Sequence, residues 1–214
     1  MSLLRRTQRS CRSWTNERMN TDSAQSRNDQ WERIGDRLYR FIDSCVVLAL
    51  DTGLSMIVIN AGTGRWVDHL DELPRPAVTL ILTHFFRDHT SGAQRAAEAG
   101  IEIYASHWEK EQLADPTGLF ARRETYIIYD NNWDLFSPIE PVPVTRWLQD
   151  YEEINVGGLT LEVIPAPGAS LGAIAIGVDT GEERLLFAGE AIHTPGKILR
   201  IAPLQYNYND LPGA

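Results

Sequence analysis

The chain has 214 residues, of which 43% are hydrophobic, and its 29 acidic against 20 basic side chains give a formal net charge of -9. This length suits one domain that buries roughly 70% of the surface its unfolded form exposes. The acidic excess argues against nucleic acid as a partner, because phosphate binding requires clustered lysine and arginine. No apolar run approaches the roughly 20 residues that span a bilayer, so we expect no membrane segment.

The chain has two cysteines, Cys11 and Cys45, which lie far apart in the sequence, and we find no secretory signal. Disulfide frameworks belong to secreted chains with denser cysteine patterns. We therefore expect reduced thiols and a cytoplasmic protein.

Residues 1–30 differ in composition from everything that follows. They combine arginines with many Ser, Thr, Asn and Gln residues and lack periodic apolar positions. Such a segment cannot bury enough apolar surface to fold, which predicts a disordered tail before a domain over 31–214. The first 16 residues also have the composition of a transit peptide, or of sequence upstream of a start at Met19, and we favour the tail.

After Trp31 the chain changes to short apolar runs separated by turn residues. The runs 39–43, 45–50 and 54–60 predict an antiparallel meander. Alternating helices and strands are then expected at 66–73 (helix), 78–82 (strand), 88–100 (helix), 101–104 (strand) and 107–113 (helix, capped by Ser106).

Residues 115–150 are rich in proline and aromatic side chains, which is typical of a lid or a long connection. Strands resume afterwards, and Gly157-Gly158 predicts a tight hairpin between the first two. The expected strands are 153–156, 159–164, 173–178 and 184–188. Sheet, helices and sheet in this order predict an α/β fold with two β layers and helices outside them.

The segment from Leu80 to Gly92 carries the strongest functional signal. An apolar strand delivers His84, Asp88 and His89 to the start of a helix. These side chains offer a nitrogen, an oxygen and a nitrogen, which Zn²⁺ binds at about 2.0–2.2 Å. The spacing alone leaves a second interpretation open, in which Asp88 caps the helix and both histidines have structural roles.

Thr83 to Gly92 resembles the H-x-H-x-D-H motif of the metallo-β-lactamase superfamily. Three further segments resemble its landmarks in the same order: 59–62 its D-x-G turn, 165–172 its P-x-P-G-H-T-x-G loop, and 185–190 its L-F-x-G-D strand end. The resemblance covers about residues 31–214. It implies a four-layer αββα sandwich in which loops at one edge of the sheets hold metal ions for hydrolysis.

Two positions depart from the family at its first metal. There the family uses the two leading histidines of the motif and the histidine of the P-x-P-G-H loop, whereas this chain has His84, Phe86 and Ala169. Phe and Ala have no lone pair to donate, so a family-like first site is not expected. Phe85 and Phe86 would instead pack the space of an imidazole and a metal.

At the family's second metal, the resemblance matches Asp88, His89 and Glu190, the last being one methylene longer than the usual Asp. The family's final histidine has no counterpart, and His193 is expected either as a surface histidine or as a substitute ligand. The chain also stops where family members continue. We therefore expect an incomplete C-terminal part, whose exposed sheet edge allows homo-oligomers.

His84, Asp88, His89 and Glu190 remain as predicted ligands of one metal ion, zinc or alternatively Mn or Fe. Asp88 would also be the catalytic proton acceptor in hydrolysis of a small-molecule ester, thioester or amide. The sequence leaves two other interpretations open. One is a non-catalytic binding or scaffold protein without a metal, and the other is a truncated product with neither role.

Overall fold

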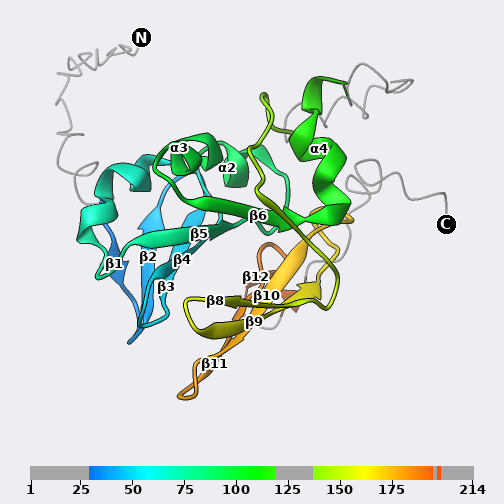
Figure 1. Cartoon of the computed structure of the whole chain (residues 1–214). Helices are drawn as coiled ribbons and strands as arrows, with labels where there is room; N and C mark the ends of the chain where they lie inside the picture. Colours follow the sequence, from blue (N-terminus) through cyan, green and yellow to red (C-terminus); the bar gives the residue numbers. More distant parts are fainter. Residues whose placement is uncertain (1–28, 119–136, 195–196, 199–214) are drawn as a thin grey trace, which may run out of the picture.

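The computed structural model describes residues 29–118, 137–194 and 197–198 (Figure 1). The expected tail over 1–30 lies almost wholly outside these residues, and so does the middle of the expected lid, 119–136. The side chain of His193 also lies outside the described part, so neither of its expected roles is tested.

A seven-stranded sheet has its strands in chain order. Strands β1 to β4 pair antiparallel, which confirms the predicted meander, and β4 to β7 pair parallel. The strands are β1 (Glu32–Arg33), β2 (Leu38–Ile42), β3 (Val46–Asp51), β4 (Met56–Ile59), β5 (Ala77–Ile81), β6 (Glu102–Ser106) and β7 (Arg146–Leu148). Strand β7 was not expected, because it lies inside the segment predicted as a lid or connection.

A second, antiparallel sheet has the order β11-β10-β9-β8. Its strands are β8 (Glu153–Val156), β9 (Leu159–Pro165), β10 (Ile174–Asp179) and β11 (Arg184–Phe187), and a two-stranded sheet of β12 (Ile192–Thr194) and β13 (Lys197–Ile198) follows. The hairpin predicted at Gly157 and Gly158 is confirmed, since both have positive φ, 57° and 83°.

Short helices cover the face of the larger sheet that is turned away from the second sheet (Figure 1). They are the 3₁₀ helices η1 (Arg65–Glu72) and η2 (His107–Glu109) and the α-helices α2 (Arg87–Thr90), α3 (Ala93–Glu98) and α4 (Lys110–Ala114). The predicted cap is confirmed, because Ser106 Oγ accepts from the backbone N–H of Trp108.

The prediction of a single helix over 88–100 is wrong, because the helical conformation is interrupted between α2 and α3. Gly92 lies at this break and packs directly on the loop after β4. A Cβ at Gly92 would lie 2.4 Å from the backbone nitrogen of Gly64. The backbone N–H of Gly92 donates to the carbonyl of Gly62 at 2.8 Å. Tertiary contact with that loop therefore overrides the helical pattern.

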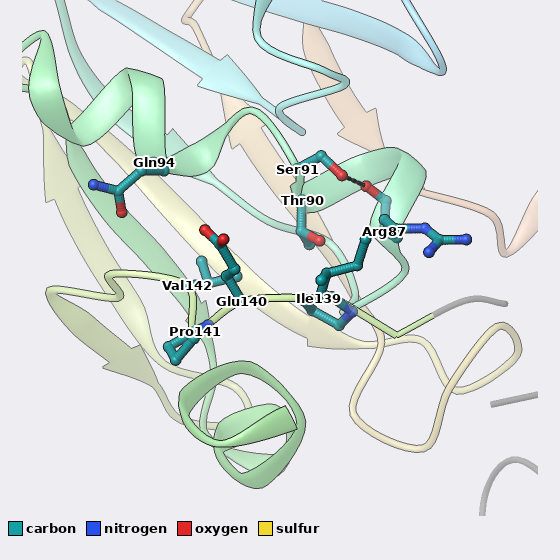
Figure 2. A pocket seen from close by; sticks show the side chains of 9 residues that line it. Arg87, Thr90, Ser91, Gln94, Ile139, Glu140, Pro141 and Val142 are labelled. Carbon is teal, nitrogen blue, oxygen red and sulfur yellow. Dashed lines mark hydrogen bonds between the residues drawn. The ribbon is translucent and has the colours of Figure 1, made fainter. Parts of the chain in front are cut away.

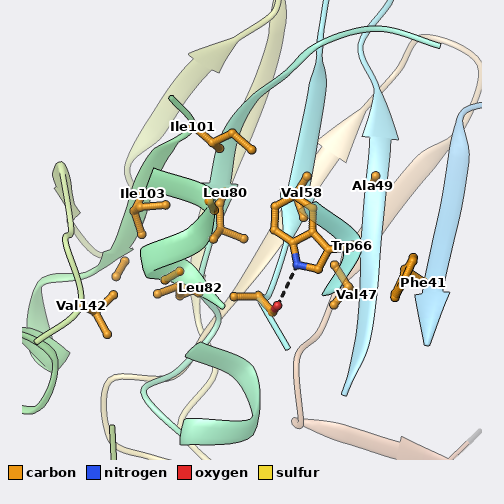
Figure 3. Close-up of a cluster of buried hydrophobic side chains, with 14 of the residues drawn as sticks. Phe41, Val47, Ala49, Val58, Trp66, Leu80, Leu82, Ile101, Ile103 and Val142 are labelled. Carbon is orange, nitrogen blue, oxygen red and sulfur yellow. Dashed lines mark hydrogen bonds between the residues drawn. The ribbon is translucent and has the colours of Figure 1, made fainter. Parts of the chain in front are cut away.

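Strand β4 shows how the two cores form, because its side chains alternate between the faces of the sheet. Met56 and Val58 belong to the cluster between the larger sheet and the helices, where Trp66 donates its Nε1–H to the carbonyl of Ala61 at 2.7 Å (Figure 3). Ile57 and Ile59 belong to the cluster between the two sheets. The strand is buried on both faces, as its unbroken apolar run indicates.

The α/β architecture predicted from the sequence is confirmed, with two β layers and helices against the larger one. Among the described residues, helices lie against only this one sheet, so the fourth layer of the expected sandwich is not among them. None of the described helices has the length and apolar character needed to traverse a bilayer.

Candidate metal centre

Three strand ends bring the polar cluster together. Strands β4 and β5 run parallel, so the segments that follow Ile59 and Ile81 leave the sheet at the same edge. The end of β11 approaches this edge through Gly189, whose φ is 55° and where a Cβ would lie 2.9 Å from Thr83 Cβ. Glycine therefore allows the close approach that carries Glu190 to the histidines.

The structure places His84, His89 and Glu190 in one group. One ligand atom from each lies within 4.8 Å of the others, and Nε2 of His84 is 4.0 Å from Oε2 of Glu190. The two imidazole rings have their centroids 4.2 Å apart. Donors around a tetrahedral zinc ion are about 3.3 Å apart, so modest side-chain adjustment would bring these three into ligand geometry.

A chain of hydrogen bonds determines the tautomer of His84. Thr83 donates both its backbone N–H and its hydroxyl to Oδ1 of Asn60, at 3.0 and 2.9 Å. Since the hydroxyl proton is used there, Thr83 Oγ1 accepts from Nδ1–H of His84 at 3.0 Å. The lone pair of His84 is therefore on Nε2, the atom that faces Glu190.

The environment of His84 keeps the ring uncharged. Burial, together with the neighbouring His89, lowers the pKa of His84 well below its ordinary value. Nε2 of His84 and Nδ1 of His89 are both buried without a hydrogen-bond partner. Unpartnered buried nitrogens are costly, and neutral imidazoles are what a metal ion requires, so this set of donors fits a metal.

Asp88 lies next to this group but outside it. Its Oδ1 is 3.2 Å from Nδ1 of His89, in a direction that does not meet hydrogen-bond geometry, and its side chain is partly exposed. Although burial opposes this, the interaction with His89 lowers the pKa of Asp88, so the carboxylate is anionic at neutral pH. The structure thus brings together three of the four predicted ligands, with Asp88 beside them.

Phe86 and Ala169, at the two positions where the resemblance leads one to expect histidines, lie in an apolar environment. The ring of Phe86 contacts that of His84, with centroids 4.8 Å apart. Both Phe86 and Ala169 are buried members of the same hydrophobic cluster. The ring of Phe86 therefore places carbon atoms in the space next to His84.

Two of the three donors, His89 and Glu190, line a cavity of about 400 Å³ at the end of the two sheets, whereas the buried His84 does not. Asp88, His89 and Glu190 are in its wall, together with Asn60 and Cys45. The remaining wall is formed by Ser44, Val46, Leu48, Ile59, Leu186, Phe187, Ala188 and Gly189. The cavity is large enough for a small molecule, and its wall combines anionic and apolar side chains.

The short helix α2 separates this cavity from a second one. The second cavity has a volume of about 240 Å³ and lies between α2 and residues 138–142. Figure 2 shows the side chains that line it. Arg87 and Thr90 line it, whereas Asp88 and His89 of the same helix line the first cavity. Ser91, Gln94 and Glu140 add its other polar side chains. No predicted ligand faces this second cavity.

Sequence reasoning missed Glu109, which is fully buried. Ser170 Oγ and the backbone N–H of Phe85 donate to its carboxyl group, and burial raises its pKa to about 8. Glu109 thus connects the loop after His84 to the loop of Ala169. The spacing from Ser106 to Glu109 is that of a capping box, which would have predicted an exposed carboxylate.

Comparison with known families and proteins identifies the family of the chain. A family model described as the metallo-beta-lactamase superfamily matches residues 49–211. An uncharacterized protein of Mycobacterium tuberculosis is 22% identical over 156 residues, which cover 70% of this chain and 67% of the relative. An uncharacterized protein of Mycobacterium leprae is 25% identical over 139 residues, which cover 63% of this chain and 62% of the relative.

Solved structures show the same fold. A metallo-β-lactamase from Cronobacter sakazakii, described by a HARLDQ motif, has a TM-score of 0.63 at 24% identity, covering 84% of this chain and 70% of its own. A class B3 di-zinc metallo-β-lactamase from an Alaskan soil metagenome has a TM-score of 0.58 at 21% identity, covering 73% of this chain and 61% of its own.

Proposed function

The chain belongs to the metallo-β-lactamase superfamily, and from this premise we propose that it is a hydrolase whose reduced centre holds one metal ion through His84, His89 and Glu190. The observation that carries the proposal is the convergence of these three donors around the unpartnered Nε2 of His84. Zinc is the proposed ion, because two imidazoles and a carboxylate suit it, although Mn²⁺ and Fe²⁺ accept the same donors.

A cation held there would act as a Lewis acid toward a substrate carbonyl and make water acidic enough to ionise at about pH 7. The protein supplies the proton acceptor. Asp88 lines the cavity and has a lowered pKa, so it is ionised at neutral pH and can take a proton from water beside His89. The cavity volume and mixed lining suit a small ester, thioester or amide.

Hydrolysis of a panel of small esters, thioesters and amides tests this function. The full chain loaded with zinc should turn over at least one class, and chelation of the metal should abolish the turnover. His89→Ala should abolish it as well, whereas His69→Ala removes an imidazole on η1, remote from the cavity, and should retain it. Equal rates for the wild type and His89→Ala would contradict the proposal.

A second function is favoured by the apolar environment of Phe86 and Ala169. A protein in which these side chains replace ligands could keep the cavity for binding a small molecule without chemistry. This alternative predicts no turnover with any metal and a melting temperature that a chelator leaves unchanged. A fall in melting temperature on chelation would exclude it.

A further inference from the structure

The buried carboxyl group of Glu109 has no part in the proposed centre, although it connects two segments that border it. Glu109 ends the short helix η2 and is 2% exposed. Its carboxyl group accepts from the backbone N–H of Phe85 and from Oγ of Ser170, which is also buried. Phe85 follows His84 directly, and Ser170 follows Ala169. Burying a carboxyl group costs free energy, and these hydrogen bonds offset that cost.

Hydrogen bonds fix the peptide groups on both sides of His84. Before it, the carbonyl of Thr83 accepts from the backbone N–H of Ile174 at 2.8 Å. After it, the N–H of Phe85 donates to Glu109. Peptide groups are planar, so fixing both of them determines the backbone dihedral angles of His84 and the direction in which its side chain points. The first bond joins two backbone groups, whereas the second depends on a single side chain.

The loop of Ser170 packs closely on Glu109. At Gly172, a Cβ would lie 2.4 Å from Cγ of Glu109 and 2.8 Å from Cβ of Trp108. Glycine is therefore needed for this close approach, which brings Ser170 to the carboxyl group. Ser170 thus holds the carboxyl group in the position at which it accepts from Phe85.

We propose that Glu109, held by Ser170, is a positioning residue that sets the place of His84 in the metal centre. The inference rests on the proposed centre and deepens it. Nε2 lies at the end of the His84 side chain, 4.0 Å from Oε2 of Glu190, so a small change in the backbone angles of His84 would displace it from that group. A working site requires its ligands to be held within about 0.5 Å. Thr83 sets the tautomer of His84, and Glu109 sets its position.

Cobalt and zinc binding to the full chain test this role without measuring activity. At saturating cobalt, the visible d–d absorption of Co²⁺ depends on the geometry of its ligands, which a loss of stability alone does not change. Glu109→Leu removes both hydrogen bonds, so it should shift the cobalt bands and weaken zinc binding by about 10–100-fold. The pKa of about 8 leaves Glu109 mostly uncharged at neutral pH, so Gln is a close replacement. Glu109→Gln should therefore retain the cobalt spectrum and the zinc affinity of the wild type.

Two further variants separate positioning from stability. Leu50 is fully buried in the core between the two sheets and does not line the cavity. Leu50→Ala should therefore lower the melting temperature and keep the cobalt spectrum. Ser170→Ala removes only one hydroxyl group, and it should weaken zinc binding in the same direction as Glu109→Leu. If Glu109→Leu does not fold, Ser170→Ala decides.

A wild-type cobalt spectrum in Glu109→Leu, or unchanged zinc affinity in Ser170→Ala, would overturn the positioning role while leaving the metal centre in place. An equal shift of the cobalt bands in Leu50→Ala or in Glu109→Gln would overturn it as well, because neither variant removes the two hydrogen bonds. No cobalt absorption in the wild type would overturn the metal centre itself, and this inference with it.

Discussion

Oγ1 of Thr83 lies 3.0 Å from Nδ1 of His84, and this contact determines which nitrogen of the ring faces Glu190. Thr83 is held in turn by Asn60, which accepts from both its N–H and its hydroxyl. A single hydroxyl thus connects the turn after β4 to a predicted metal ligand.

Thr83→Val should remove the hydrogen bond that orients the His84 ring while preserving the shape of the side chain at position 83. Loss of a group that orients a ligand weakens metal binding by about 10–100-fold, and we expect zinc affinity to fall within that range. Calorimetric zinc titration checks the result. Thr79→Val makes the same change at a buried position of β5 and should leave zinc affinity unchanged. Equal affinities for the two variants would contradict the role of Thr83.

Asp88→Asn should separate proton transfer from metal binding. The Asp88 carboxylate lies outside the group formed by His84, His89 and Glu190, so the variant should retain its zinc. Loss of a proton acceptor lowers turnover by about 10²-fold or more, and we expect kcat to fall accordingly. Metal content and kcat measured on the same preparation check both parts. Loss of zinc from Asp88→Asn would instead support the sequence-based prediction that Asp88 is itself a ligand.

Restoring two imidazoles should create a second metal position. Phe86 contacts His84, and Phe86 and Ala169 belong to one buried hydrophobic cluster. Phe86→His with Ala169→His would therefore add two nitrogen donors to the apolar space next to His84. We expect zinc stoichiometry to rise from one to two, at a stability cost of about 1–3 kcal/mol for added volume at Ala169. Phe85→His with Ala169→His is the matched control, and the same rise in that pair would show that the added histidines bind zinc without a formed site.

Glu109→Gln should change how stability depends on pH. The pKa of Glu109 rises from 4.5 to about 8 on folding, so the folded chain keeps a proton that the unfolded chain releases. The stability linked to this proton is fully present below pH 4.5 and is lost as pH rises to about 8, with a slope of up to about 1.4 kcal/mol per pH unit.

Urea unfolding of Glu109→Gln between pH 5 and about 8 should therefore show a flatter profile than the wild type. The exposed Glu153 on β8 offers a matched control, since Glu153→Gln should reproduce the wild-type slope. A wild-type slope retained in Glu109→Gln would show that the carboxyl group is ionised in the folded chain.

Local pattern predicted most of the fold and identified the residues of the candidate site. The structure of β4 and of the turn at 157–158 could be predicted from adjacent residues, namely an apolar run and a glycine pair. His84 and His89 lie within one motif. Glu190 is far from them in sequence, but it comes at the end of a strand that the family resemblance identified.

Features set by distant contacts were not predictable from local sequence. The break at Gly92 depends on its packing against Gly64, and the burial of Glu109 depends on Ser170, 61 residues further along the chain. Cys45 likewise reads as a small apolar residue at the start of a strand. Only the folding of the β2–β3 turn against α2 places Cys45 in the wall of the cavity.

Elemental analysis of the purified full chain, after expression with added zinc, tests the metal centre most directly. We predict close to one equivalent of zinc per chain, lost in both His84→Ala and His89→Ala and retained in His69→Ala. A wild type that purifies without metal, and whose melting temperature zinc does not raise, would contradict the centre formed by His84, His89 and Glu190.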